Sequence, residues 1–146
     1  MTDTPEHLAS AIVTVDLAAL KSNYRTLSAK AAPAACGVAI KGEAYGLGMA
    51  MVAKVLWAEG CKNFFVARPM EGAELRGVLP DAAIYVLDGL YSGQVDFYLK
   101  NRLMPALVSL VEAQEWALKS SGAPCAIHFD TGIHRLGFTP AEFAKL

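Results

Sequence analysis

Short apolar runs alternate with helix-like segments along this 146-residue chain, and this alternation limits its fold more than any other feature. Short, continuously apolar runs are typical of parallel strands that are covered by helices. We predict five such strands, at residues 35–40, 64–67, 83–87, 104–108 and 125–129. The sequence therefore predicts an α/β fold with a parallel sheet and right-handed crossovers.

Helical periodicity fills the gaps between these runs. Asp16 has the chemistry of an N-cap for a first helix, and Thr139 that of a cap for a last helix from Pro140. Further helices are predicted at residues 49–59, 71–78, 93–100 and 111–121. Each predicted strand is thus separated from the next by a helix.

Two architectures fit this alternation. One is a complete five-strand doubly wound sheet of the flavodoxin type, for which the chain length is suitable. The other is the first part of an eight-strand (βα)₈ barrel, which as a whole needs more than about 200 residues. Hydrophobic residues make up 54% of the chain and charged residues 18%, against roughly 25% in typical domains. This apolar balance predicts a strand-rich buried sheet, or a surface that faces another domain or subunit.

Charge and cysteine content exclude several classes of function. With a net charge of −1, the chain has no bulk attraction for nucleic acid or for an anionic membrane. The three cysteines are widely spaced and form no metal-binding motif, so we predict reduced core thiols and no metal site. There is no signal-peptide pattern and no bilayer-length apolar run, so we expect a cytoplasmic protein. Residues 1–10 are predicted to be a flexible N-terminus, and residues 11–146 one domain.

The stretch KGEAYGLG, residues 41–48, directly follows the first predicted strand. Lys41 therefore lies at the carboxyl end of a parallel strand, where α/β folds place their sites. It is either a strand-ending lysine that points to water, or an amine with a lowered pKa that can form a Schiff base with an aldehyde cofactor. Tyr45 and the two glycines that follow predict a tight turn into the next helix, and Tyr45 could bind a phosphate.

The stretch HFDTGIHRLGF, residues 128–138, follows the fifth predicted strand. Asp130, His134 and Arg135 lie close together on one loop at the same functional face of the sheet. The structural alternative is a capped turn in which Asp130 accepts hydrogen bonds from backbone amides and Arg135 is solvated.

Taken together, KGEAYGLG and FDTGIHRLGF resemble the N-terminal barrel domain of alanine racemases, which are fold-type III pyridoxal-phosphate enzymes. Residues 15–27, 60–76 and 101–109 are also similar to segments of this family, in the same order. The resemblance implies a partial (βα)₈ TIM-type barrel with about five parallel strands over residues 11–146, truncated relative to the family.

The resemblance also implies roles for individual residues. Lys41 would hold pyridoxal 5′-phosphate as the Schiff-base lysine and act as acid and base on one face of the substrate. Tyr45 would contact the cofactor phosphate, Arg135 would lie beside the phenolic oxygen, and Leu87 would be an apolar neighbour. His128 stands where many members have a carbamylated lysine that pairs with the arginine, so we place it beside the cofactor contacts.

The implied function is an alanine racemase, or a fragment of one, that interconverts L- and D-alanine by a two-base proton shift. The full-length family is homodimeric, and its opposite-face base belongs to a part of the family that this sequence does not contain. The alternative is a non-catalytic partial barrel that binds cofactor weakly or only assembles with other chains. Its open sheet edges invite self-association. The pair Gly42-Glu43 departs from the family's usual Ala-Asp or Ala-Asn, and we expect this change to be tolerated within a turn.

Overall fold

The computed structural model describes residues 8–146, so the predicted flexible N-terminus falls largely outside the described residues. The elements are α1 (Leu17–Ala31), β1 (Val38–Ala39), α2 (Lys41–Tyr45), α3 (Met49–Ala58), β2 (Asn63–Val66), α4 (Pro69–Val78), β3 (Ala83–Val86), α5 (Val95–Lys100), β4 (Met104–Leu107), α6 (Leu110–Lys119), β5 (Ala126–Ile127) and α7 (Pro140–Phe143).

The five strands form one parallel sheet in the consecutive order β1-β2-β3-β4-β5. A doubly wound sheet of the flavodoxin type would have β1 between β2 and β3. A (βα)₈ barrel instead places each strand beside the next one in the chain. The strand order therefore confirms the partial barrel and excludes the doubly wound alternative.

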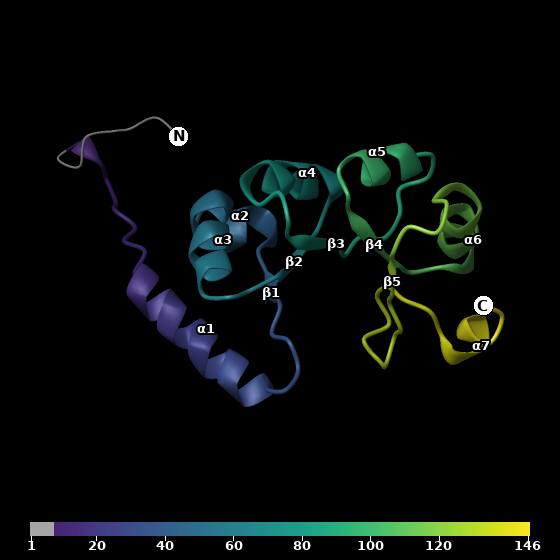
Figure 1. Ribbon diagram of the computed structural model, residues 1–146, viewed down its shortest axis with the longest axis horizontal. Helices are drawn as coiled ribbons and strands as arrows, with labels where there is room; N and C mark the ends of the chain where they lie inside the picture. The colour runs from purple at the N-terminus through teal and green to yellow at the C-terminus, as the bar shows by residue number, and fades with distance from the viewer. Residues whose placement is uncertain (1–7) are drawn as a thin grey trace.

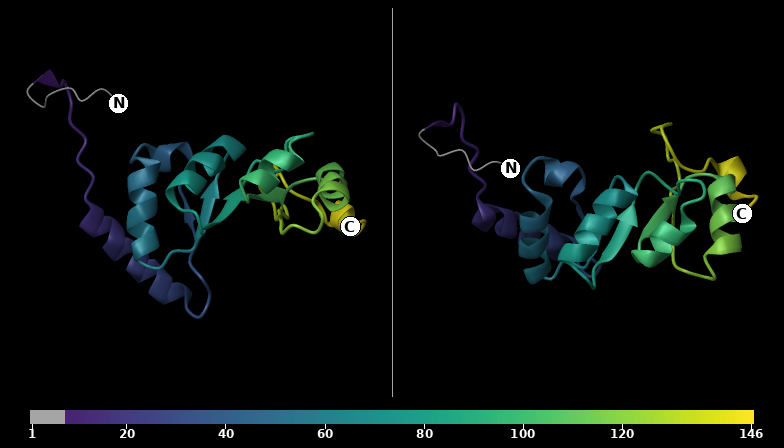
Figure 2. Two further views of the ribbon diagram at one scale, coloured as in Figure 1. Left: turned by 45° about the horizontal axis from the view of Figure 1, so that its top comes forward. Right: turned by 90° about the horizontal axis from the view of Figure 1, so that it is seen from above.

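The helices lie along one side of the row of strands. Figure 1 shows α3, α4, α5 and α6 in succession along this side, with α1 at the N-terminal end of the row and α7 at the other end. The rotated views in Figure 2 keep the same linear order. The sheet thus has a helix-covered face and a second face, which we call the inner face because it corresponds to the inside of a barrel.

The core fills the space between the sheet and its helices. Alternate strand residues on the helix-covered face are fully buried, among them Phe64, Val66, Ile84, Val86 and Leu107. On β2 and β3 the intervening residues, on the inner face, are only partly buried: Phe65 and Tyr85 stack there with ring centroids 4.9 Å apart. The inner face is therefore apolar but incompletely covered by the described residues.

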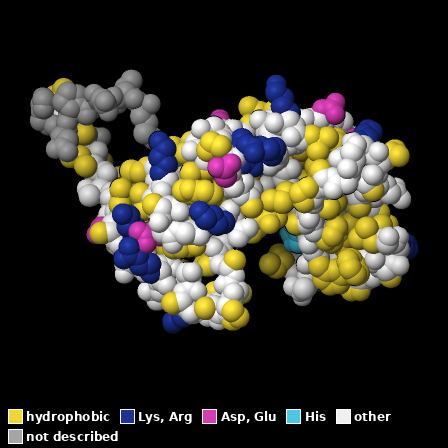
Figure 3. Space-filling view, viewed as in Figure 1, with side chains coloured by type: hydrophobic (Ala, Val, Ile, Leu, Met, Phe, Trp, Pro, Cys, Tyr) yellow, Lys and Arg dark blue, Asp and Glu magenta, His cyan; other side chains and the backbone are white. Residues whose placement is uncertain are grey.

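Exposed apolar side chains also gather over the C-terminal units, at the right of Figure 3. Val111 and Leu118 on the outer side of α6, and Ile133 after β5, are each more than 70% exposed. This distribution accounts for part of the high apolar content. Within residues 8–146, no helix combines the length and apolar character needed to cross a bilayer.

Several predicted boundaries were wrong. The edge strands β1 and β5 have only two residues each, because each has a neighbour on one side alone. Helix α4 begins at Pro69 and not at Glu71, since proline is well suited to the first helical position. Helix α5 begins at Val95, because Gly93 has a φ of +75° that no right-handed helix accommodates.

Candidate functional site

Lys41 lies where the sequence predicts it, immediately after β1, and its side chain is half-buried. The preceding residue, Ile40, still belongs to the sheet because its N–H donates to the Phe65 carbonyl at 2.9 Å. Ala39 pairs with Phe65, and Phe65 with Tyr85. Lys41, Ala67 and Leu87 follow these three residues by two positions each, at the carboxyl ends of β1, β2 and β3. The structure thus places two of the predicted site residues, Lys41 and Leu87, at the carboxyl ends of β1 and β3, with β2 between these strands.

The turn α2 after Lys41 has a left-handed backbone. Gly42, Glu43, Ala44 and Tyr45 all have φ values between 52° and 59°. Outside glycine, this conformation costs roughly 1–2 kcal/mol for each residue. Such a run persists only when surrounding contacts hold it, and conformations of this kind cluster at functional sites. The turn is therefore a strained segment attached directly to the candidate lysine.

Glu43 stabilises the far end of this turn. Its side-chain Oε2 accepts the Met49 N–H at 3.0 Å, and its carbonyl accepts the Gly48 N–H at 2.8 Å. The side chain thus caps the first turn of α3, which has no side-chain cap from Gly48. Gly42, with no Cβ, takes up the left-handed conformation at little cost. Gly42 and Glu43, which stand where the family usually has Ala-Asp or Ala-Asn, therefore each have a local structural role.

Glu71 stabilises the near end, and sequence reasoning missed it. Its carboxylate accepts backbone N–H groups from Gly42 at 2.8 Å, Ala67 at 2.8 Å and Arg68 at 3.0 Å. Burial alone would raise the pKa of Glu71, but these hydrogen bonds outweigh it and lower the pKa below its ordinary value. The sequence does contain a pattern that indicates this role. A glutamate two residues after Pro69 is at position N3 of the helix, where it can cap the N-terminus.

Glu112 occupies the corresponding place on α6. It is three residues after the N-cap Ser109, and its Oε2 accepts N–H groups from Val108 at 3.0 Å and Leu90 at 3.1 Å. Like Glu71, it joins two loops: the one that leads into its own helix, and the one that follows the neighbouring strand earlier in the chain. The carboxyl-end loops are thus tied in pairs by glutamates, β1 with β2 and β3 with β4.

The remaining predicted site residues are more dispersed. Tyr45 is 68% exposed on the turn α2, in the same segment as Lys41. His128 is half-buried, and Arg135 is exposed on the loop after β5, at the opposite end of the sheet. Among the hydrogen bonds and ion pairs of the described residues, none joins Arg135 to Lys41, Tyr45 or His128. Lys41 and Tyr45 thus share the segment after β1, Leu87 directly follows β3, and His128 and Arg135 lie apart from them on the segment after β5.

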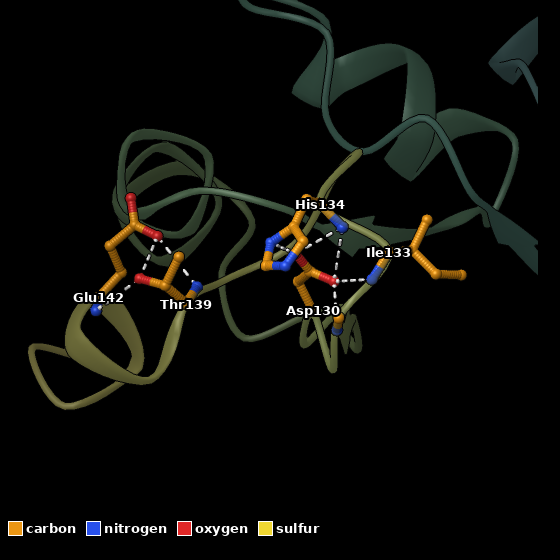
Figure 4. Close-up of polar contacts among 6 residues, drawn as sticks. Asp130, Ile133, His134, Thr139 and Glu142 are labelled. Carbon is orange, nitrogen blue, oxygen red and sulfur yellow. Dashed lines mark hydrogen bonds and ion pairs between the residues drawn. The ribbon is translucent and has the colours of Figure 1, made fainter.

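The loop that carries Arg135 is organised by Asp130. The Asp130 carboxylate accepts N–H groups from Gly132, Ile133 and His134 at 2.9 to 3.1 Å, and His134 Nδ1 lies 3.3 Å from Oδ2 (Figure 4). The prediction of a turn capped by Asp130, with Arg135 exposed to solvent, is thus confirmed. Arg135 lines a pocket of about 270 Å³ together with Asp130 and His134. A second capped segment follows, in which Thr139 and Glu142 form the reciprocal cap of α7 (Figure 4).

We expect the stability that Asp130 contributes to vanish in acid. The N–H groups of Gly132, His134 and Ile133 lower its pKa below the ordinary value of 3.8. Because the folded-state pKa is the lower one, this contribution is complete above pH 3.8 and is lost as the pH falls through the folded value. The measurement is denaturant unfolding of the wild type and Asp130→Asn from pH 7 to pH 2. The stability difference between them should be largest at pH 7 and shrink below pH 4. A difference that persists unchanged at pH 2 would contradict this account.

Other features of the described residues lie away from Lys41. A pocket of about 440 Å³ opens beside Arg76 and Arg102, at the amino ends of β3 and β4. It therefore lies at the opposite end of the strands from the carboxyl-end loops. Across residues 8–146, no group of three or more His, Cys, Asp or Glu side chains is placed to hold a metal ion.

Comparison with known proteins was consistent in sequence and in structure. Residues 15–146 match the family model described as alanine racemase, N-terminal domain. An alanine racemase of Methylobacterium nodulans is 47% identical over the whole chain, and one of Methylobacterium sp. strain 4-46 is 42% identical. The chain spans only 40% and 41% of the length of these relatives.

Solved structures give the same result. The crystal structure of alanine racemase from Bartonella henselae with covalently bound pyridoxal phosphate superposes with a TM-score of 0.84 at 34% identity, over 90% of this chain and 40% of that one. The biosynthetic alanine racemase from Pseudomonas aeruginosa gives a TM-score of 0.80 at 28% identity, over 90% of this chain and 37% of that one.

Proposed function

This chain belongs to the family of alanine racemase N-terminal domains, and on that premise we propose that it forms the cofactor-binding part of a pyridoxal-phosphate-dependent alanine racemase. The observation that carries the proposal is the position of Lys41. Lys41 is half-buried at the carboxyl end of β1, at the same end of the sheet as apolar Leu87 and directly before a strained turn. No ion pair within the described residues occupies its amine. An amine placed in this way fits covalent capture of an aldehyde.

The proposed roles follow the sequence. Lys41 would hold pyridoxal phosphate covalently through its side-chain amine, and it would move a proton on one face of the substrate. The Tyr45 hydroxyl binds the phosphate, and Leu87 provides an apolar wall. Arg135 would bind the phenolic oxygen, and His128 would stand beside the cofactor contacts. When bound, pyridoxal phosphate supplies an electron sink that acidifies the α-proton of an amino acid.

The complete reaction needs more than these residues. Exchange of the α-proton between two faces requires a second proton-transfer group opposite Lys41. We propose that this group lies outside these 146 residues, because the chain spans about 40% of its relatives. On this proposal the substrate is a small amino acid, the active assembly is a cytoplasmic homodimer, and residues 11–146 are the N-terminal part of its barrel. The alternative is a partial barrel that binds cofactor weakly or only assembles with other chains. The observation in its support is the incompletely covered inner face.

Replacing Lys41 by alanine should abolish covalent cofactor binding. The chain is mixed with pyridoxal phosphate, reduced with borohydride, digested and analysed by mass spectrometry, and its absorbance is recorded after desalting. We expect a band near roughly 420 nm and a pyridoxyl group on Lys41 in the wild type, and neither in Lys41→Ala. Lys54→Ala is the matched control, because Lys54 is exposed on α3 and should not affect the result. If exposed lysines are labelled as fast as Lys41, the covalent role is wrong and the weak-binding alternative is favoured.

A further inference from the structure

We propose that Glu71 is a positioning residue for Lys41, an inference that rests on the proposed covalent role of that lysine. Glu71 lies on α4, but its Oε1 accepts the Gly42 N–H at 2.8 Å. That N–H belongs to the peptide group that joins Lys41 to Gly42. The hydrogen bond therefore fixes the orientation of the peptide plane that immediately follows Lys41.

Lys41 is consequently held between two anchored neighbours. On one side, the Ile40 carbonyl, which belongs to the peptide group that joins Ile40 to Lys41, accepts the Ala44 N–H at 2.9 Å. On the other side, the Gly42 N–H is bonded to Glu71. With both flanking peptide groups fixed, the Lys41 side chain leaves the backbone in one direction. A reacting group gains rate when its geometry is set in advance in this way.

The left-handed backbone explains why such an anchor is needed. Glu43, Ala44 and Tyr45 are not glycine, so local preference favours relaxation of α2 to a right-handed or extended form. Glu43 holds only the far end of the turn, through Met49. Glu71 holds the end next to Lys41. Its other oxygen accepts the Ala67 and Arg68 N–H groups, so the carboxylate is itself fixed.

Glu112 provides an internal comparison. It has the same N3 position and also joins two carboxyl-end loops through backbone N–H groups, those of Val108 and Leu90. Neither of those loops contains Lys41. A general loss of loop stability should therefore follow from alanine at either glutamate, whereas misplacement of Lys41 should follow only from Glu71→Ala.

The test measures the rate at which Lys41 acquires the pyridoxyl group, using pyridoxal phosphate and borohydride trapping in the 146-residue chain. We expect Glu71→Ala to slow this rate about tenfold or more, because small displacements of a reacting group have large effects. Glu71→Gln should restore part of the rate, since its amide oxygen can still accept the Gly42 N–H. Glu112→Ala should stay within about twofold of wild type. Tm values and amide exchange at Gly42 are measured on the same samples, and Gly42 should lose protection only in Glu71→Ala.

The outcomes separate the two proposals. Equal slowing by Glu71→Ala and Glu112→Ala, at equal loss of Tm, would mean that Glu71 is only structural. A wild-type rate in Glu71→Ala would also overturn the positioning role. If wild type itself acquires no pyridoxyl group at Lys41, the proposed function fails and this inference fails with it. If Glu71→Ala does not fold, Glu71→Gln decides the question, because a wild-type rate combined with an unprotected Gly42 amide would overturn the inference.

Discussion

Phe64→Ala should lower the free energy of unfolding by about 3–5 kcal/mol, the range for large-to-small changes of buried aromatic residues. Phe64 is fully buried on the helix-covered face of β2, and it pairs with Val38 on one side and Ile84 on the other. The cavity would lie at the junction of three strands, where the surrounding backbone has little freedom to collapse. Because typical domains have about 5–15 kcal/mol in total, the loss would be a large fraction of the stability. Denaturant unfolding followed by circular dichroism measures it.

The neighbouring residue provides the control. Phe65 is only partly buried on the inner face, where it stacks on Tyr85. Phe65→Ala should therefore cost only about 1–2 kcal/mol. If the two variants lose equal stability, the inner face is covered in solution as fully as the helix side. Such a result would indicate association between copies of the chain through this face.

Arg76→Met should cost about 3 kcal/mol, because it removes the charged donor from several carbonyls at once. The Arg76 guanidinium donates to Pro80 and Ala82 at 2.8 Å, to Asn101 at 3.0 Å and to Arg102 at 2.6 Å. These carbonyls belong to the two loops that precede β3 and β4. One side chain thus holds the amino ends of both strands in place. Chemical unfolding of the purified variant gives the loss directly.

Arg102 is the matched control for this prediction. It is an exposed arginine in the same region, with one hydrogen bond, to the Pro80 carbonyl at 2.7 Å. Arg102→Met should cost no more than about 1 kcal/mol. Arg76→Lys should remain destabilised, because an ammonium group cannot reach carbonyls spread around a planar guanidinium. Full stability in Arg76→Lys would show that charge alone, and not the geometry of the donors, matters here.

The parts of the fold that were predictable are those fixed by local pattern. The central strands Asn63–Val66, Ala83–Val86 and Met104–Leu107 each lie within one residue of the predicted runs. An apolar run with a strand on both sides must be buried, so its composition reveals it. The same holds for the predicted caps at Asp16 and Thr139, whose side chains accept backbone N–H groups in the first turns of their helices. The strand order was not predictable in this way. The local pattern fitted two architectures, and only the family motifs favoured the barrel.

The site was predictable only in part, for a physical reason. The position of Lys41 follows from the end of a strand, so the sequence was sufficient. The left-handed turn at Glu43–Tyr45 opposes local preference, and it is held by contacts within the turn and by one from Glu71 on α4 to the Gly42 N–H. No local pattern reveals a conformation that a distant side chain imposes. The predicted helix start at Glu71 also concealed its N3 position, and with it the hydrogen bond to Gly42.

The consecutive strand order has a consequence for motion. In a row of this kind each strand bonds only to the next, so cooperativity is confined to nearest neighbours, as in a linear array. Opening can then begin at the short end strands β1 and β5 and advance inward, without breaking the bonds between β2 and β3. Amide hydrogen exchange should accordingly be graded, fastest at the two ends and slowest near Phe64 and Ile84. Lys41 lies next to one of these ends, so the segment that carries the reactive amine is among the first to open, and a neighbour added along β1 would slow that opening.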